Sequence, residues 1–103
     1  MRRITIIVYE QDDVRYDNEV LGYVGESGAT TLDVSLPSDW TGNFYVDWKV
    51  DGEWIETEEA HTTTDFEEEV PDEAIVRGDV FMRIRIVDGE NTGYTKTIKF
   101  VVR

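Results

Sequence analysis

The chain contains no cysteine, so disulfide frameworks and cysteine-based zinc sites are excluded. It has a single histidine, His61, and no Gly-x-Ser-x-Gly motif, and no set of a nucleophile and a base stands out. Because His61 lies in the polar run 60–63, we expect it to be a mobile imidazole at the surface. The sequence therefore predicts a non-enzymatic protein with no catalytic residue, no metal ligand and no cofactor.

Basic residues are scarce as well, since 10 Lys and Arg stand against 23 Asp and Glu and give a net charge of −13. An acidic surface repels phosphate backbones and anionic membranes, so neither direct nucleic-acid binding nor membrane binding is expected. The charge is compatible with plain solubility, with a basic protein partner and with mimicry of nucleic acid. Calcium binding by converging acidic loops also stays open, although no loop has the spaced Asp-x-Asp-x-Asn-Gly pattern.

Long apolar runs are missing too, and no stretch approaches the ~20 apolar residues that a membrane-spanning helix needs. The start of the chain resembles a signal peptide, with Arg2 and Arg3 before an apolar segment. Thr5 interrupts that segment, acidic residues end it, and no small-residue cleavage site follows. We expect a protein that stays in the bacterial cytoplasm or is packed into a virion. Its 103 residues suit one domain, 1–103.

The clearest pattern present is the alternation of apolar and polar residues over 43–55. Phe44, Val46 and Trp48 share one parity, which predicts a strand with these residues in the core. Asp51-Gly52 follows, and this pair favours the type I′ turn of a hairpin because both residues tolerate a positive φ. The segment therefore predicts a β-hairpin at the centre of the fold.

Similar segments predict further strands at 3–9, 20–24, 30–36, 64–70, 79–87 and 94–102. Residues 10–19 are expected to form a loop or an irregular edge, and 71–78 a turn or a single helical turn. Seven to eight short strands predict an all-β fold, an antiparallel two-sheet β-sandwich of the immunoglobulin-like or jelly-roll-like type. A small barrel is the alternative.

Five residues are candidates for binding: Trp40, Tyr45, Trp54, Arg83 and Arg85. Trp40 follows a proline turn and either caps the core or anchors a partner or a sugar ring. Tyr45 and Trp54 suit a sugar platform or ordinary cross-strand pairs. Arg83 and Arg85 share one strand face, where they are neutralised by carboxylates or contact a partner.

The order of several motifs is similar to that of a known family. The motifs are 31–37, Trp40-Thr41-Gly42, the 45–48 strand, Val70-Pro71 with Gly78, and 81–89. Over most of residues 20–103 this order resembles N-terminal β-sandwich domains of phage and prophage tail or baseplate structural proteins. The resemblance implies an attachment module without catalytic residues that fixes a fibre or receptor-binding protein to the tail.

Partners implied by the resemblance are other tail or baseplate proteins or further copies of the chain. Family members commonly continue into a stalk or receptor-binding region, so we expect either a piece of a longer protein or a stand-alone subunit. Two other functions stay open: a carbohydrate-binding module that uses exposed Trp or Tyr, and an acidic nucleic-acid mimic that inhibits a DNA-binding enzyme.

Overall fold

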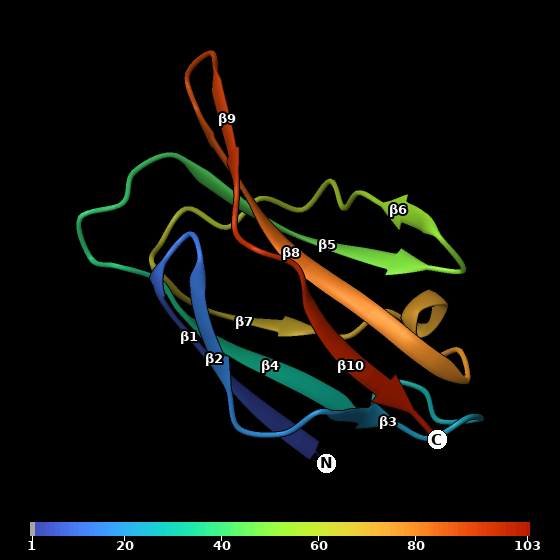
Figure 1. Ribbon diagram of the computed structural model, residues 1–103. Coiled ribbons are helices and arrows are strands. Elements are labelled where there is room, and N and C mark those ends of the chain that lie inside the picture. Colours follow the sequence, from blue (N-terminus) through green and yellow to red (C-terminus); the bar gives the residue numbers. More distant parts are fainter. Residues whose placement is uncertain (1) are drawn as a thin grey trace.

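In the computed structural model, which describes residues 2–103, the chain forms two β-sheets and one turn of 3-10 helix (Figure 1). The predicted all-β class is thus confirmed. The first sheet has four strands in the order β2-β1-β4-β7. The bounds of these strands are β1 Arg2–Glu10, β2 Asp13–Tyr16, β4 Thr30–Ser35 and β7 Asp65–Glu69.

The second sheet has six strands, five of them in the order β3-β10-β8-β5-β6, and β9 pairs with β8 beyond β10. The bounds are β3 Val20–Gly22, β5 Asn43–Val50, β6 Glu53–Ile55, β8 Gly78–Asp88, β9 Asn91–Tyr94 and β10 Ile98–Val102. The long strand β8 joins β5 on one side to β9 and β10 on the other (Figure 1).

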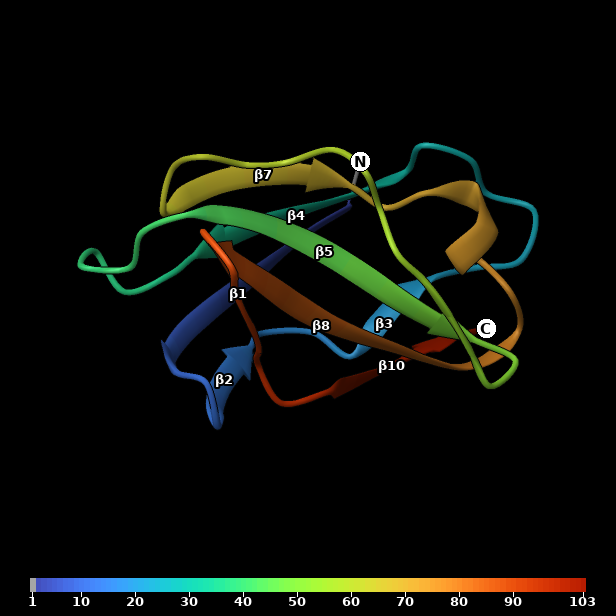
Figure 2. The same cartoon turned by 90° about the horizontal axis from the view of Figure 1, so that it is seen from above.

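The two sheets form separate layers that enclose one apolar core (Figure 2). Ile4 and Ile6 point into it from the four-stranded sheet, and Phe44, Trp48 and Ile84 from the six-stranded sheet. The predicted core position of Trp48 is confirmed, since its side chain is fully buried. Each large apolar side chain that is fully buried contributes about 1.5–3 kcal/mol to stability, so the alternation seen in the sequence accounts for the layered fold.

The expectation of purely antiparallel sheets is wrong, because both sheets are mixed. β1 pairs in parallel with β4, and β10 pairs in parallel with β3, whereas the other pairings are antiparallel within residues 2–103. A period of two shows which side chains face the core, but it carries no information on the direction of the neighbouring strand.

The ten strands of the described residues exceed the predicted seven to eight for two reasons. β2 lies inside 10–19, where a loop or irregular edge was expected. Val14 and Tyr16 pack there against the core opposite Val8 and Ile6. The expected strand 94–102 is instead divided into β9 and β10, with Thr95 buried at the break.

Two turns follow the sequence prediction. Asp51 has φ 52° and Gly52 has φ 81°, so the β5–β6 turn has the positive dihedrals expected of Asp-Gly. A 3-10 turn, η1 (Asp72–Ala74), lies where the sequence predicted a turn or a single helical turn.

Gly42 has φ 114°, and a Cβ at this position would lie 2.5 Å from the Val87 carbonyl oxygen. Only glycine therefore allows the loop after β4 to approach β8 so closely.

Candidate binding surface

Four of the five predicted binding residues gather on the outer face of the six-stranded sheet. In the register of β5 and β8, Tyr45 lies opposite Arg85. Trp54 of β6 lies opposite Lys49, and Tyr94 of β9 lies opposite Arg85 on its other side. We call Tyr45, Trp54, Arg83, Arg85 and Tyr94 the aromatic–arginine face. Tyr94 was not among the sequence candidates, because its place beside β8 depends on the separate strand β9.

The guanidinium groups of this face lie over its aromatic rings. The Arg83 guanidinium carbon is 4.0 Å from the ring centre of Trp54 and 4.2 Å from that of Tyr94. Arg85 lies 4.2 Å from the ring centre of Tyr45. A cation over a ring face contributes about 0.5–1 kcal/mol at an exposed site and about 2 kcal/mol when desolvated. The contacts therefore hold three rings and two cations in one arrangement.

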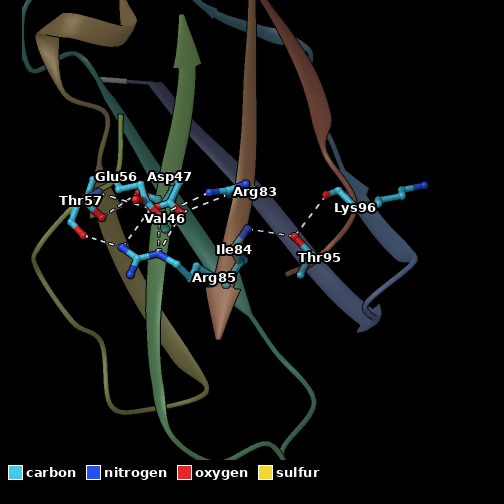
Figure 3. A network of polar contacts seen from close by, with 9 residues as sticks. All are labelled: Val46, Asp47, Glu56, Thr57, Arg83, Ile84, Arg85, Thr95 and Lys96. Carbon is cyan, nitrogen blue, oxygen red and sulfur yellow. Dashed lines mark hydrogen bonds and ion pairs between the residues drawn. The ribbon is translucent and has the colours of Figure 1, made fainter. Parts of the chain in front are cut away.

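A buried carboxylate, Asp47, holds both arginines from the neighbouring strand β5 (Figure 3). Its side chain is 0% exposed, and its Oδ2 atom accepts hydrogen bonds from Nε of Arg83 at 3.2 Å and from Nε of Arg85 at 3.0 Å. The Thr57 amide donates to Oδ1 at 3.3 Å, and the Thr57 carbonyl accepts from Arg85 at 2.9 Å. A buried charge of this kind is tolerated only when it is paired and hydrogen-bonded.

Asp47 also affects the protonation of its partner. Burial lowers the pKa of Arg85, but the hydrogen bond and negative charge of Asp47, with smaller contributions from Glu56 and Tyr45, more than offset this, so the pKa is raised. Arg85 accordingly stays charged. Sequence reasoning placed Asp47 on the polar side of β5 and assigned it no role. The role of Asp47 follows from the strand register, in which this acid lies opposite Arg83 and diagonal to Arg85 on one sheet face.

Glu56 completes the charges around the arginines, but it does so from the solvent side. Its carboxylate lies 3.5 Å from Nη2 of Arg83 and 3.4 Å from Nε of Arg85, and its side chain is 54% exposed. Exposed ion pairs contribute about 0–1 kcal/mol. The geometry of the face is therefore set by Asp47 rather than by Glu56.

Trp40, the fifth predicted residue, lies away from the others at one end of the molecule. It is half-buried and packs against the core, as one of its two sequence interpretations held. It also borders a groove of about 760 Å³, which we call the end groove. The groove is lined by Tyr9, Glu10, Gln11, Asp12, Pro37, Asp39, Trp40, Tyr94, Thr95 and Lys96. A second depression of about 340 Å³ shares Gln11, Asp39 and Trp40 with it.

His61 is not the mobile surface imidazole that the sequence predicted. Its ring stacks on Phe66 with 4.0 Å between ring centres, and its Nε2 atom lies 2.8 Å from Oε1 of Glu68. The backbone of His61 also pairs with that of Phe44. Burial raises the pKa of Glu68, although the hydrogen bond and charge of His61 act in the opposite direction. The polar residues around His61 in the sequence gave no sign that this segment lies against β5, and the surface prediction was wrong for that reason.

The described residues offer no cluster with metal-binding geometry, since no three His, Asp or Glu side chains in 2–103 are grouped suitably. Nor is any helix in this range long and apolar enough to cross a membrane. No protein family, curated protein or solved structure matches the chain. The residues of the surface itself therefore carry the functional argument.

Proposed function

We propose that this protein is a non-enzymatic binding module whose contact surface for another protein is the aromatic–arginine face. The observation that carries the proposal is the arrangement of three rings around Arg83 and Arg85, anchored by the fully buried Asp47. Trp, Tyr and Arg are the residues that most often supply the binding energy of protein interfaces.

Rigidity favours this surface further. Binding costs about 0.5–1.5 kcal/mol for each flexible side chain that becomes fixed. Arg83 and Arg85 are already fixed by Asp47, and the rings are fixed by the guanidinium groups, so this cost is largely removed. A protein partner can contact the ring edges and the guanidinium groups as well as the ring faces, so the mixed chemistry of this surface suits a protein.

We place this binding in a phage or prophage tail or baseplate, with other tail proteins or further copies of the chain as partners. The support is the resemblance in residue order over 20–103, described above. A virion or the bacterial cytoplasm would then be its location. The immunoglobulin-like or jelly-roll-like type of the fold stays a prediction from strand number and spacing.

The test is pairwise binding, by biolayer interferometry, of this protein to the proteins encoded beside its gene. We expect at least one of them to bind the wild type. The double variant Y45A/W54A should weaken that binding by about tenfold or more, which corresponds to the loss of 1.4 kcal/mol. Ile7→Ala, on the outer face of the other sheet, is the matched control and should bind as the wild type does.

Two results would contradict the proposal. One is that no neighbouring protein binds at concentrations up to ~100 μM, which is weaker than most specific interfaces. The other is that Y45A/W54A binds as tightly as Ile7→Ala. Circular dichroism melting curves of the variants show that any loss of binding is not a loss of folding.

A further inference from the structure

The end groove lies where three segments far apart in the sequence meet. These are the turn after β1, the loop after β4, and β9 with the residues that follow it. Hydrogen bonds join the first and third of these segments to each other and the loop after β4 to the end of β8. The Lys96 amide donates to the Gln11 carbonyl at 2.6 Å, and Nε2 of Gln11 donates to the Tyr94 carbonyl at 3.1 Å. Thr41 donates to Asp88 at 2.8 Å. The walls of the groove are therefore held in place by these hydrogen bonds before any ligand binds.

Three aromatic rings border the groove. Tyr9 and Tyr94 are 52% and 44% exposed, while Trp40 is half-buried and borders both depressions. Arg15 lies 4.9 Å from the Tyr9 ring centre and Arg83 lies 4.2 Å from that of Tyr94, so both outer rings are supported. None of the three rings stacks on another within residues 2–103. Rings spaced along a groove suit an extended ligand, whereas a cage for one cation needs rings gathered around a point.

The polar groups of the groove include both donors and acceptors. The carboxylates of Glu10, Asp12 and Asp39 have no side-chain hydrogen bond or ion pair within residues 2–103. Lys96 adds a donor, and the amides of Gln11 and Asn91 offer both donors and acceptors. Hydroxyl groups of a sugar both donate and accept, so this mixture matches them. A basic peptide would be attracted by the same carboxylates, so it is the alternative occupant that the test below distinguishes.

The charge of the groove narrows the class of ligand. Glu10, Asp12, Asp39 and Asp88 stand against a single cation, Lys96, so an anionic ligand is disfavoured. The volumes of about 760 and 340 Å³ lie in the range of small-molecule sites, about 300–1,000 Å³. From these observations we infer that the end groove binds a neutral oligosaccharide, with sugar rings against Trp40, Tyr9 or Tyr94 and hydroxyl groups on the carboxylates and amides.

This site goes beyond the proposed protein contact and shares only Tyr94 with the aromatic–arginine face. The test is titration of ¹⁵N-labelled protein with a panel of neutral gluco-, galacto- and manno-oligosaccharides, observed through the indole N–H signals of the tryptophans. At least one glycan at ~10 mM or below, a concentration that detects binding weaker than a Kd of about 1 mM, should shift the Trp40 signal.

Variants locate the binding. Asp39→Asn and Tyr9→Ala change exposed groove residues and should each weaken glycan binding by about fivefold or more, since a hydrogen bond to a charged group or a ring contact is lost. Asp65→Asn, an exposed carboxylate on β7, is the matched control and should bind as the wild type does. Trp54→Ala should also leave glycan binding unchanged, which separates this inference from the proposed protein contact.

Three outcomes would overturn the inference. The first is that no glycan of the panel shifts the Trp40 signal. The second is that a glycan binds but Asp39→Asn and Tyr9→Ala bind it as tightly as Asp65→Asn. The third is that a short oligolysine peptide shifts the Trp40 signal at lower concentration than any glycan, which would assign the groove to a basic peptide.

Discussion

Asp47 is the residue on which the aromatic–arginine face depends most. Replacing it with alanine leaves the guanidinium groups of Arg83 and Arg85 without their buried partner. We expect Asp47→Ala to lower the free energy of unfolding by about 3–5 kcal/mol, the usual cost of removing one member of a buried ion pair. Urea denaturation at pH 7 measures this change.

The matched control is Glu56→Gln, which removes a carboxylate from the same arginines at the solvent side. Its effect should stay below about 1 kcal/mol, because exposed pairs contribute little. Equal effects of the two variants would show that Asp47 has no special role. A small effect of Asp47→Ala alone would show that water replaces the carboxylate at little cost.

Glu68 makes stability depend on pH. Its side chain is 9% exposed, and burial raises its pKa above the ordinary value of 4.5. His61 lowers the pKa of Glu68 in part, and the negative charges of Glu59 and Asp47 raise it further. The native state thus holds the Glu68 proton more tightly than the unfolded chain does. The stability that this proton contributes is complete below pH 4.5 and is lost as the pH rises through the raised pKa.

The test compares the wild type with Glu68→Gln by urea denaturation between pH 4 and 8. Glutamine cannot ionise, so the variant lacks this contribution to the pH dependence. The free energy of unfolding of the wild type, relative to that of the variant, should fall as the pH rises from about 4.5 and then level off. A constant difference across this range would contradict the predicted shift of the Glu68 pKa.

At the scale of residues, the sequence predicts which face of a strand a side chain lies on better than it predicts whether that side chain is buried. Trp48 and Phe44 are buried because the period of two places them between the two sheets. Asp47 has the opposite parity and is buried as well, since the arginines and the segment at Thr57 cover it. That cover depends on which strands become neighbours, and no local pattern encodes it. Glu68 shares the parity of Phe66 and Val70, but its contact with His61 also depends on which segments become neighbours.

Among the secondary-structure elements, the break between β9 and β10 depends on Thr95. Its hydroxyl accepts a hydrogen bond from the Ile84 amide at 2.9 Å and donates one to the Lys96 carbonyl at 3.2 Å. Thr95→Val keeps the shape and removes both bonds. We expect it to lower the free energy of unfolding by about 1–3 kcal/mol, because a buried amide loses its acceptor.

Thr95→Ser is the control for this prediction, since it keeps the hydroxyl and removes one methyl group. Urea denaturation measures both variants, and hydrogen exchange of the Ile84 amide reports on the bond itself. In Thr95→Val this amide should exchange faster, whereas in Thr95→Ser it should stay protected. Faster exchange in both variants to the same degree would indicate that packing of the methyl group, rather than the hydroxyl, matters here.

The positions of most strands can be predicted from the sequence, but their neighbours cannot. The β5–β6 hairpin joins two strands that are adjacent in the sequence, and the turn residues Asp51-Gly52 predict it. The parallel pairing of β1 with β4 joins segments separated by the whole of β2 and β3. The residues of β1 and of β4 carry no pattern that identifies the other strand as the neighbour. The same holds for the binding surface. Tyr45 and Arg85 were predicted as separate candidates, whereas the place of Tyr94 depends on the pairing of β9 with β8.

For the molecule as a whole, the two outer faces differ in charge. The outward positions of β4 and β7 carry four carboxylates, Asp33, Asp65, Glu67 and Glu69, beside two cations on β1 and β2, Arg3 and Arg15. The outward positions of β5, β8 and β10 carry four cations, Lys49, Arg83, Arg85 and Lys99, beside two carboxylates, Asp47 and Asp79. The net charge of the chain is −13. Reversing one charge should therefore have opposite effects on the two faces.

We expect Asp65→Lys to raise stability in ~20 mM NaCl and Lys99→Glu to lower it, each by up to about 0.5 kcal/mol. The first relieves repulsion among carboxylates, and the second adds negative charge to an already acidic molecule. In ~1 M NaCl, where the Debye length is about 3 Å, both effects should nearly vanish. Urea denaturation at the two salt concentrations tests this, and effects that persist in high salt would contradict an electrostatic origin.

Both ends of the described chain contact the short strand β3. Nη1 of Arg2 donates to the Leu21 carbonyl, and the Arg103 amide donates to the Gly22 carbonyl. The end groove lies at the opposite end of β1, away from the labelled termini in Figure 1. An affinity tag at either end would thus attach the protein to a sensor chip with the groove directed into the flow. Immobilised molecules would share one orientation, and an array built in this way could display the groove to whole cells.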